Sequence, residues 1–262
     1  MRDPHVAALR YRLVPAETVS FDQPPLVERD TEAFRLRLLD GIATFEMVEH
    51  HASEESARRR VEPYLRAWEL DVALRFGRSE IGFQFEGADV IDRSPPPPGT
   101  GQVIYPKAVA AVIGVMGSVA VHLTRGQYPA PPEGFVASPD VETMWHRYER
   151  HLEGRELLAS MAYFCLTLLE GSAGSRDRAA KQYGISGKVL DTLGRLTTEI
   201  GDEQTARKAS RLRERRPYTG AEKTWLEATV KALIRRAGEW AYAAEAQRPT
   251  LTMEDLPKLP SS

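Results

Sequence analysis

Hydrophobic and polar residues alternate through much of the first ninety positions, as they do in a sheet that buries one face. The segment FRLRLL at 34–39 alternates apolar residues with arginine, which is the period of a half-buried strand. Asp40-Gly41 is a two-residue hairpin signal that leads into a second strand at 42–47. Further strands are predicted at 8–14, 17–21 and 81–92, the last with Ile81, Phe83 and Phe85 facing inward.

One helix is predicted between the strands at 42–47 and 81–92. Ser53 is placed to cap it, and Glu54 and Glu55 suit the positive N-terminal end of the helix dipole. Its apolar stripe, at helical spacing, consists of Ala57, Val61, Leu65, Trp68 and Val72. Pro63 predicts either a kink or a later start, because a proline inside a helix costs roughly 3 kcal/mol.

Two proline-rich segments follow the predicted sheet. SPPPPG at 94–99 must be extended, and YPAPPEG at 128–134 is a second break. Between them, the apolar stretch 108–123 is predicted to be a short helix that turns into a buried strand. A membrane span is the alternative, but the stretch is shorter than the ~18–20 apolar residues that a span needs.

Beyond residue 137 the apolar spacing becomes helical. Ser138-Pro139 is a cap with proline in the first turn, and the segment 156–170 is apolar nearly all round, with Gly171 as its expected end. Thr219 and Glu222 form a capping box before a last long helix. The apolar residues of the first of these helices are Val141, Met144, Trp145, Tyr148 and Leu152, and those of the last are Trp225, Leu226, Val230, Leu233, Ile234 and Trp240.

These patterns predict an α+β fold, in which an N-terminal antiparallel sheet with one packed helix is followed by a C-terminal α-helical bundle. We expect a sheet domain at 1–93, a proline-rich connection at 94–137, a helical bundle at 138–250 and a tail at 251–262.

Composition adds little to this picture. The net charge of -2 gives no general reason to expect a nucleic-acid partner. The charge is uneven, however, because residues 1–93 contain 13 basic and 18 acidic groups whereas 138–262 contain 20 and 18. An anionic partner would therefore favour the C-terminal part.

Cys165 is the sole cysteine of the sequence, so an intrachain disulfide is excluded. The first twelve residues, MRDPHVAALRYR, lack the apolar core of a signal peptide. We expect a soluble, cytoplasmic protein without membrane association.

Residues 145–156, WHRYERHLEGRE, place Arg147 and His151 one helical turn apart. The segment resembles the Arg-x4-to-6-His motif of HEPN ribonucleases, and the C-terminal part resembles the helical bundle that contains that motif. The spacing here is Arg-x3-His, and no other arginine–histidine pair of the C-terminal half restores it. Helical phase places the pair on the flank of its helix, so we expect a solvated flank with His151 half covered at its edge, and we assign no catalytic residue.

The stretch RDRAAKQYGISGKVLDTLGR at 176–195 resembles a helix-turn-helix. Ala180 is small where the two helices of that motif approach, and Gly184 stands at the turn, where positive φ is needed. The buried positions of the motif fall on Ala179, Tyr183, Ile185, Leu190 and Leu193. The resemblance implies that the second helix offers Ser186, Lys188, Asp191, Thr192 and Arg195 to a major groove.

Three features of this stretch favour the alternative, two packed helices in a larger bundle. Gly187 and Gly194 each cost a helix about 1 kcal/mol. Asp191 would face the phosphates of a nucleic acid.

A basic segment follows at 206–217, ARKASRLRERRP. It opposes a single Glu214 with the basic residues Arg207, Lys208, Arg211, Arg213, Arg215 and Arg216. Such a segment can bind phosphates through charge alone, although it lacks the interleaved aromatic residues of a single-strand platform. A solvated loop is the alternative.

Acidic residues and histidines also crowd together near position 50, as Glu46, Glu49, His50, His51 and Glu54. Adjacent histidines on a strand point to opposite faces, and the spacing fits no zinc or iron motif, so we predict no metal site. We also find no phosphate-binding glycine loop, dinucleotide fingerprint or nucleophile elbow, and predict no cofactor.

Three classes of function remain open. The first is a non-catalytic intracellular binding protein with an unknown protein partner or with self-association. The second is a nucleic-acid-binding regulator or accessory factor that binds DNA or RNA through 176–216. The third is an enzyme without a recognisable motif, because sites built from Glu, Asp and Tyr leave little trace in one sequence.

Overall fold

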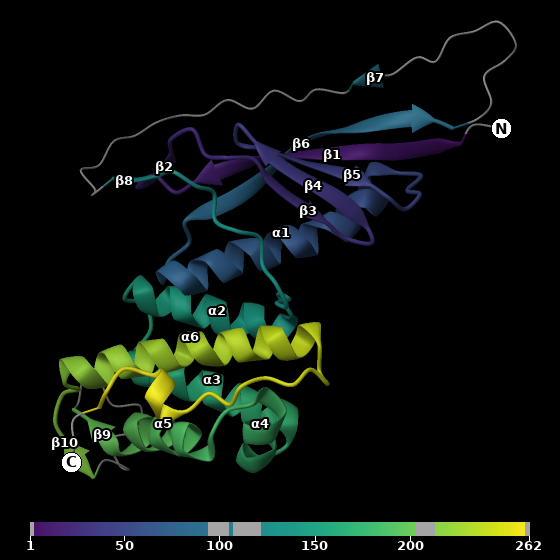
Figure 1. Cartoon of the computed structure of the whole chain (residues 1–262). Coiled ribbons are helices and arrows are strands. Elements are labelled where there is room, and N and C mark those ends of the chain that lie inside the picture. The colour runs from purple at the N-terminus through teal and green to yellow at the C-terminus, as the bar shows by residue number, and fades with distance from the viewer. Residues whose placement is uncertain (1–2, 94–104, 107–121, 203–212, 260–262) are drawn as a thin grey trace, which may run out of the picture. The chain divides into compact units, whose positions relative to one another are not determined.

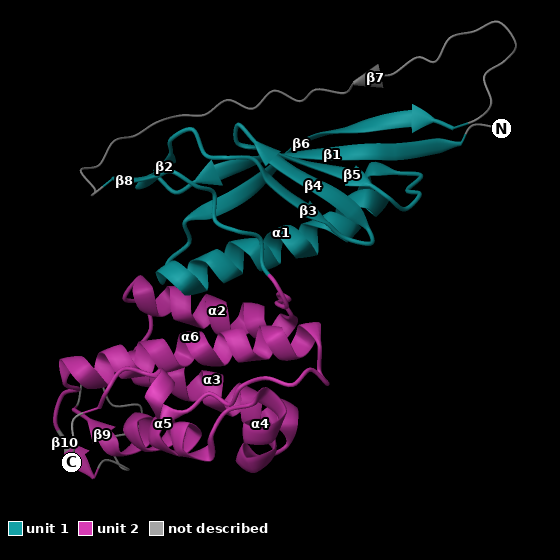
Figure 2. Ribbon diagram, in the orientation of Figure 1, with its two compact units in different colours: residues 1–132 teal, residues 133–262 magenta. Residues whose placement is uncertain are grey.

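The computed structural model describes residues 3–93, 105–106, 122–202 and 213–259. They form an α+β protein with two compact units, Met1–Pro132 and Glu133–Ser262 (Figure 2). The first unit therefore extends beyond SPPPPG at 94–99, which lies outside the described residues, to the second proline-rich segment.

A largely antiparallel sheet forms the framework of the first unit (Figure 1). Its strands and the short flanking pair are β1 (Pro4–Pro15), β2 (Val19–Phe21), β3 (Val27–Asp30), β4 (Phe34–Leu39), β5 (Ile42–Met47), β6 (Ile81–Asp92), β7 (Tyr105–Pro106) and β8 (Leu123–Arg125). The six-stranded sheet has the order β3-β4-β5-β1-β6-β7, and β2 pairs with β8 in parallel beside it. Every predicted strand of this unit is present.

The hairpin between β4 and β5 forms where the alternating pattern and Asp40-Gly41 predicted it. Asp40 and Gly41 both have positive φ, 49° and 76°, as the tight turn between twisted strands requires. This turn pairs Leu39 with Ile42 and so keeps Phe34, Leu36 and Leu38 on the buried face. The prediction from residues 34–47 is therefore confirmed in detail.

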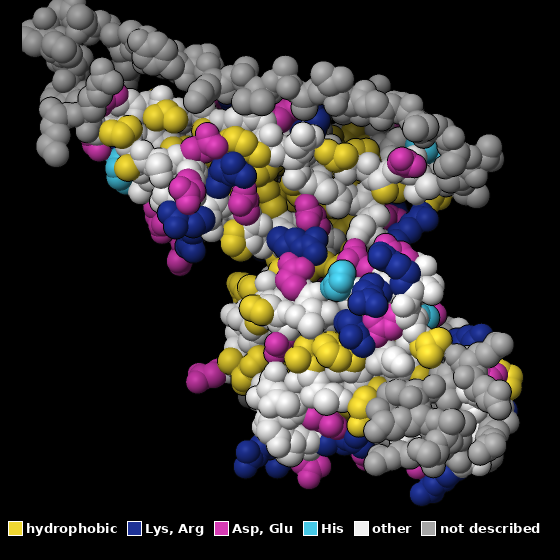
Figure 3. Space-filling model, turned by 180° about the vertical axis from the view of Figure 1, so that it is seen from behind, with side chains coloured by type: hydrophobic (Ala, Val, Ile, Leu, Met, Phe, Trp, Pro, Cys, Tyr) yellow, Lys and Arg dark blue, Asp and Glu magenta, His cyan; other side chains and the backbone are white. Residues whose placement is uncertain are grey.

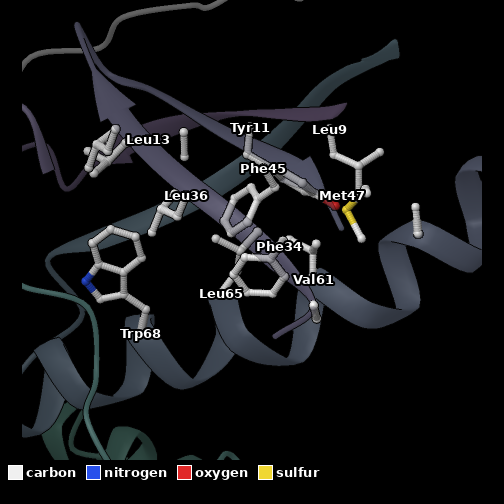
Figure 4. Packing of buried hydrophobic residues seen from close by; sticks show 14 of the residues in the cluster. Leu9, Tyr11, Leu13, Phe34, Leu36, Phe45, Met47, Val61, Leu65 and Trp68 are labelled. Carbon is white, nitrogen blue, oxygen red and sulfur yellow. The ribbon is translucent and has the colours of Figure 1, made fainter. Parts of the chain in front are cut away.

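Helix α1 (Glu54–Phe76) covers one face of this sheet. It begins where predicted, since the Ser56 amide donates to Ser53 Oγ over 3.2 Å, and it continues through Pro63 to a left-handed Gly77. All five residues of its predicted apolar stripe are buried against the sheet residues shown in Figure 4. Phe83 and Phe85, which we expected to face inward, pack against this core while remaining partly exposed.

The second unit is a helical bundle built around α3. Its elements are α2 (Pro139–Leu152), α3 (Leu158–Ala173), α4 (Arg176–Tyr183), α5 (Gly187–Glu199), β9 (Ile200–Gly201), β10 (Glu214–Arg215), α6 (Gly220–Tyr242) and the 3₁₀ turn η2 (Met253–Asp255). Helix α3 packs against α2, α4, α5 and α6, which confirms its central place. Met161, Cys165, Leu166 and Leu169 provide its fully buried core.

Three expectations from the sequence need correction, two in the second unit and one in the first. Helix α3 does not end at Gly171 but at Ala173, because Gly174 supplies the left-handed residue, φ 87°, that terminates it. Leu152 is 47% exposed because it lies in the last turn of α2, beyond the packed part of that helix. Leu123 lies in β8 as part of the strand expected at the end of 108–123, but it is 40% exposed and not buried, because among the described residues β8 pairs with the short β2 alone. Residues 108–121 of that stretch lie outside the described residues.

Within the described residues, the structure contains no helix of the length and apolar character that a membrane crossing requires.

A close contact between α6 and the segment before α2 shapes the second unit. The ring of Phe135, which is 4% exposed, lies on Gly238 so closely that a Cβ there would stand 2.2 Å from Phe135 Cε2. The glycine thus makes room for an aromatic ring that joins the two segments.

We predict that Gly238→Ala lowers the free energy of unfolding by about 1–3 kcal/mol, the usual cost of forcing an extra carbon into a packed core. Gly171→Ala is the matched control, because an added Cβ there has no atom within 4 Å and lies inside a helix. That substitution should raise stability by roughly 0.5–1 kcal/mol. Urea denaturation measures both, and a Gly238→Ala protein as stable as the parent contradicts the packing described.

Candidate functional site

The helix-turn-helix-like stretch has the local geometry that its sequence predicted. Helix α4 is capped by Ser175 and ends at Gly184, whose φ is 62°. The amide of Ile185 then donates to Ala180 O over 2.9 Å, so the chain reverses within three residues before α5 starts at Gly187. The five positions expected to be buried are all buried: Ala179, Tyr183, Ile185, Leu190 and Leu193.

The turn between the two helices is bonded to a distant part of the chain. Leu251 donates its amide to Gly184 O and accepts from the Ser186 amide, each over 2.8 Å. The segment after α6 runs back past α4 and α5 to reach this position (Figure 1). Leu251, the first residue of the expected tail, is therefore a buried part of the bundle, 8% exposed.

Gly194 and Asp191 have a role in the structure that the sequence did not reveal. A Cβ on Gly194 would stand 3.0 Å from the guanidinium of Arg176, which lies across α5 at this point. Arg176 donates to Glu170 over 2.6 Å and to Asp191 over 3.0 Å. Gly194, which we counted as a cost to α5, thus leaves room for an arginine that pairs with both Glu170 and Asp191.

Lys188 and Arg195 lie on the exposed face of α5, on which Thr192 lies half-buried. Lys188 and Arg195 are seven residues apart, which is two turns, or about 10.5 Å along the helix axis. Ser186 is half-buried beside Leu251 and is less accessible than we expected. The residues of α5 that face the bundle are Val189, Leu190, Leu193, Leu196 and Thr197.

The basic segment is described at its C-terminal end. Arg207, Lys208 and Arg211 lie outside the described residues, as does the side chain of Arg215. Arg213 is exposed, 79% of its side chain, with Glu199 at 3.6 Å. The parallel pairing of β9 with β10 and the bond from the Arg213 amide to Glu199 O place the end of this segment beside the C-terminal end of α5.

Arg216 forms hydrogen bonds within the fold and so differs from the exposed Arg213 of the same segment. Its guanidinium donates to both carboxylate oxygens of Glu222, over 2.8 and 2.7 Å, and also to Glu214 over 2.9 Å. Glu222 in turn accepts the Thr219 amide in the capping box of α6. The hydrogen bonds from Arg216 lower the pKa of Glu222 to about 2, and the bonds with Thr219 add to the shift.

Arg147 and His151 form a cluster with two glutamates. Arg147 Nη2 lies 2.5 Å from Glu156 Oε1, and the Glu156 side chain is only 7% exposed. His151 Nδ1 lies 3.1 Å from the Glu156 carbonyl oxygen, and its Nε2 lies 3.5 Å from Glu227 Oε1. Both functional groups therefore contact protein acceptors, which accounts for the pair as a structural link between α2, α3 and α6.

Sequence reasoning missed Glu156 and Glu227, which pair with Arg147 and His151 on the flank of α2, where His151 is half covered as expected. Glu156 is an acidic residue at the edge of an apolar helix, which is the signal that could have identified it. Burial raises the pKa of the nearby Cys165 thiol to about 12, as expected for an unreactive core cysteine.

The histidines near position 50 pack into the first unit. The His50 ring stacks on His5 with a centroid separation of 5.3 Å, and His51 Nδ1 lies 3.1 Å from Ser56 Oγ. Burial, followed by the positive charge of Arg93, lowers the pKa of His5. Among the described residues, no group of three or more His, Cys, Asp or Glu side chains is arranged to hold a metal ion.

We predict that Glu222→Gln lowers stability by about 2 kcal/mol at pH 7, because it removes one charge from a hydrogen-bonded pair while keeping an acceptor for the cap. The pKa of Glu222 falls from 4.5 to about 2 on folding, so its contribution is complete above pH 4.5 and is lost as the pH falls towards 2.

The difference in free energy of unfolding between the parent protein and Glu222→Gln should therefore shrink as the pH falls below 4.5. Urea denaturation at a series of pH values measures it. The exposed Glu245→Gln is the control and should show no such trend. A difference that is independent of pH would contradict the assigned pair.

Comparison with known proteins completes the description of the site. No protein-family model, no curated protein and no solved structure matches this chain. The function is therefore inferred from the residues and their geometry.

Proposed function

We propose that this protein is a non-catalytic binding protein of the cytoplasm and that its C-terminal unit binds duplex DNA through the exposed face of α5. One observation carries the proposal: Lys188 and Arg195 share one exposed face of a helix that begins at a helix-turn-helix-like turn. A helix presented in this way is the element that such motifs place in a major groove.

The charge on this face supports an anionic ligand. Asp191 lies between the two basic residues and pairs with Arg176 at 3.0 Å, while Arg176 also pairs with Glu170 at 2.6 Å. Arg213, at the end of the basic segment, lies near the C-terminal end of the same helix. On the face shown in Figure 3, basic and acidic side chains of the described residues are interspersed.

The same geometry favours contacts with phosphates over contacts with bases. Leu251 lies against the turn that precedes α5, and Ser186 is half-buried beside it. Ser186, the N-cap of α5 and one of the positions that a helix-turn-helix offers to bases, is thus partly covered. We infer binding with little sequence preference and a strong dependence on salt.

We predict that replacing both Lys188 and Arg195 with Gln weakens binding to a labelled mixed-sequence DNA duplex by tenfold or more at low salt. The slope of log affinity against log salt should fall by about 1.8, because two phosphate contacts are lost. Fluorescence anisotropy measures both quantities, and an RNA duplex of the same sequence in a parallel titration distinguishes the two nucleic acids.

The control is Arg59→Gln with Arg60→Gln, which removes the same charge from exposed positions of α1. Equal losses in the two double variants would show a general effect of charge, and undetectable binding by the parent protein would exclude the proposal.

A second candidate function is binding of a protein partner at the connection between α2 and α3. Leu152 and Leu157 are exposed there by 47% and 46%, and they flank the ion pairs of Glu156. The partner in this case is a second copy of the chain. We predict that the parent protein forms a dimer through this surface and that replacing both Leu152 and Leu157 with Ser makes it monomeric. Light scattering tests this, and a parent protein that is monomeric at high concentration contradicts self-association.

A further inference from the structure

A hollow of about 520 Å³ lies in the second unit, where the chain crosses the C-terminal half of α6. This volume is within the range of about 300–1,000 Å³ typical of small-molecule sites. Its walls come from three segments, which are residues 133–134, the last three turns of α6 and residues 246–251. All of them belong to the second unit.

Basic side chains are in excess around this hollow. Arg235, Arg236 and Arg248 line it, together with Glu133 and Glu239. The three positive charges exceed the two negative ones, which favours an anionic occupant.

The guanidinium groups of Arg236 and Arg248 are held in place by the fold. Arg236 donates to Glu239 Oε2 over 3.1 Å and to Pro249 O over 2.6 Å. Arg248 donates to two carbonyl oxygens at the C-terminal end of α6, those of Glu239 and Ala243. Because each guanidinium has about five N–H donors, each of the two retains donors for an anion in a fixed orientation.

The remaining lining is largely apolar. Tyr242, whose side chain is 61% exposed, stands at one wall, with its ring 3.8 Å from the position that a Cβ on Gly134 would take. Ala232, Ala243, Ala246, Pro249 and Leu251 complete the apolar part. An aromatic ring and small apolar side chains beside oriented arginines suit a ligand with a planar or apolar body and an anionic group.

We propose that this hollow binds a small organic anion, in which a phosphate or carboxylate contacts Arg236 and Arg248 and an aromatic body packs against Tyr242. The fixed guanidinium groups supply the paired donors that such anions bind in a bidentate manner.

The hollow shares one wall with the turn that precedes α5. Pro249 accepts from Arg236 in the hollow, and two residues later Leu251 exchanges two hydrogen bonds with Gly184 and Ser186. A ligand that changes the hydrogen bond from Arg236 to Pro249 O therefore also shifts Leu251 and the turn bonded to it. Binding of the small anion in the hollow is therefore coupled to DNA binding by α5. This coupling rests on the proposed function.

The binding site is tested directly with phenyl phosphate by isothermal titration calorimetry on the full chain. The parent protein should bind it saturably, whereas phenol, which lacks the anion, and inorganic phosphate, which lacks the ring, should bind at least tenfold more weakly. Equal affinity for inorganic phosphate, or no binding at millimolar concentration, overturns the proposal.

Two variants locate the site. Arg248→Gln removes a donor, and Ala232→Leu fills the hollow without changing its charge; each should weaken phenyl phosphate binding by tenfold or more. Lys223→Gln, at the other end of α6, removes an exposed charge outside the hollow and should leave binding unchanged. Retained binding in Ala232→Leu places the ligand elsewhere and overturns the assignment, and circular dichroism confirms that each variant is folded.

The coupling is tested by repeating the DNA titration with saturating phenyl phosphate. A change of threefold or more in DNA affinity that is absent in Ala232→Leu supports coupling, and an unchanged affinity excludes it. If the parent protein binds phenyl phosphate but not DNA, the anion site stands while the proposed function fails.

Discussion

The left-handed turn at Gly184 is the constraint on which the C-terminal unit depends. Its φ of 62° ends α4 and directs the chain into α5, a path that residues other than glycine rarely follow at low cost. On its other side the turn is fixed by Leu251 through two hydrogen bonds of 2.8 Å. One tight turn thus joins α4, α5 and the segment after α6.

Several features of α5 follow from this constraint. Because the turn fixes where the helix begins, Leu190 and Leu193 are directed into the bundle while Lys188 and Arg195 remain outside. Helix α3, apolar on most of its surface, can then be covered by α5 on one side and by α6 on another. The surface available for a ligand is a narrow strip along the helix.

Charged groups of the second unit serve mainly to hold its elements together. The carboxylate of Glu222 joins Arg216 to the start of α6, and Glu156 joins the end of α2 to the start of α3. Such partly buried pairs are costly to break, because the remaining charge would lose its partner without regaining water. Several of the arginines that the composition shows are therefore engaged within the fold.

Local features of the fold could be predicted from the sequence, and features that depend on distant residues could not. The hairpin at Asp40-Gly41, the cap at Ser53 and the turn at Gly184 are specified by a few neighbouring residues, and all three are present. The pairing of Arg147 with Glu156 across a helix end was not predicted, nor was the contact of Leu251 with the turn, because neither has a fixed spacing.

The same distinction applies to the candidate site. The choice of Lys188 and Arg195 follows from the resemblance of 176–195 to a helix-turn-helix, whereas the pairing of Asp191 with Arg176 depends on how two helices pack. Arg216 was grouped with the ligand-binding residues because charge density alone does not reveal an internal partner such as Glu222. Sequence reasoning therefore identified exposed residues of α5 but did not reveal that Arg216 is engaged within the fold.

The most direct measurement is an NMR titration of the isotopically labelled chain with a DNA duplex, which follows each backbone amide. Binding by α5 predicts that the largest shifts occur along its exposed face, at Lys188, Thr192 and Arg195, and that the sheet of the first unit is unaffected. Shifts confined to the first unit, or none at low salt and millimolar duplex, would contradict the assignment of α5 as the binding surface.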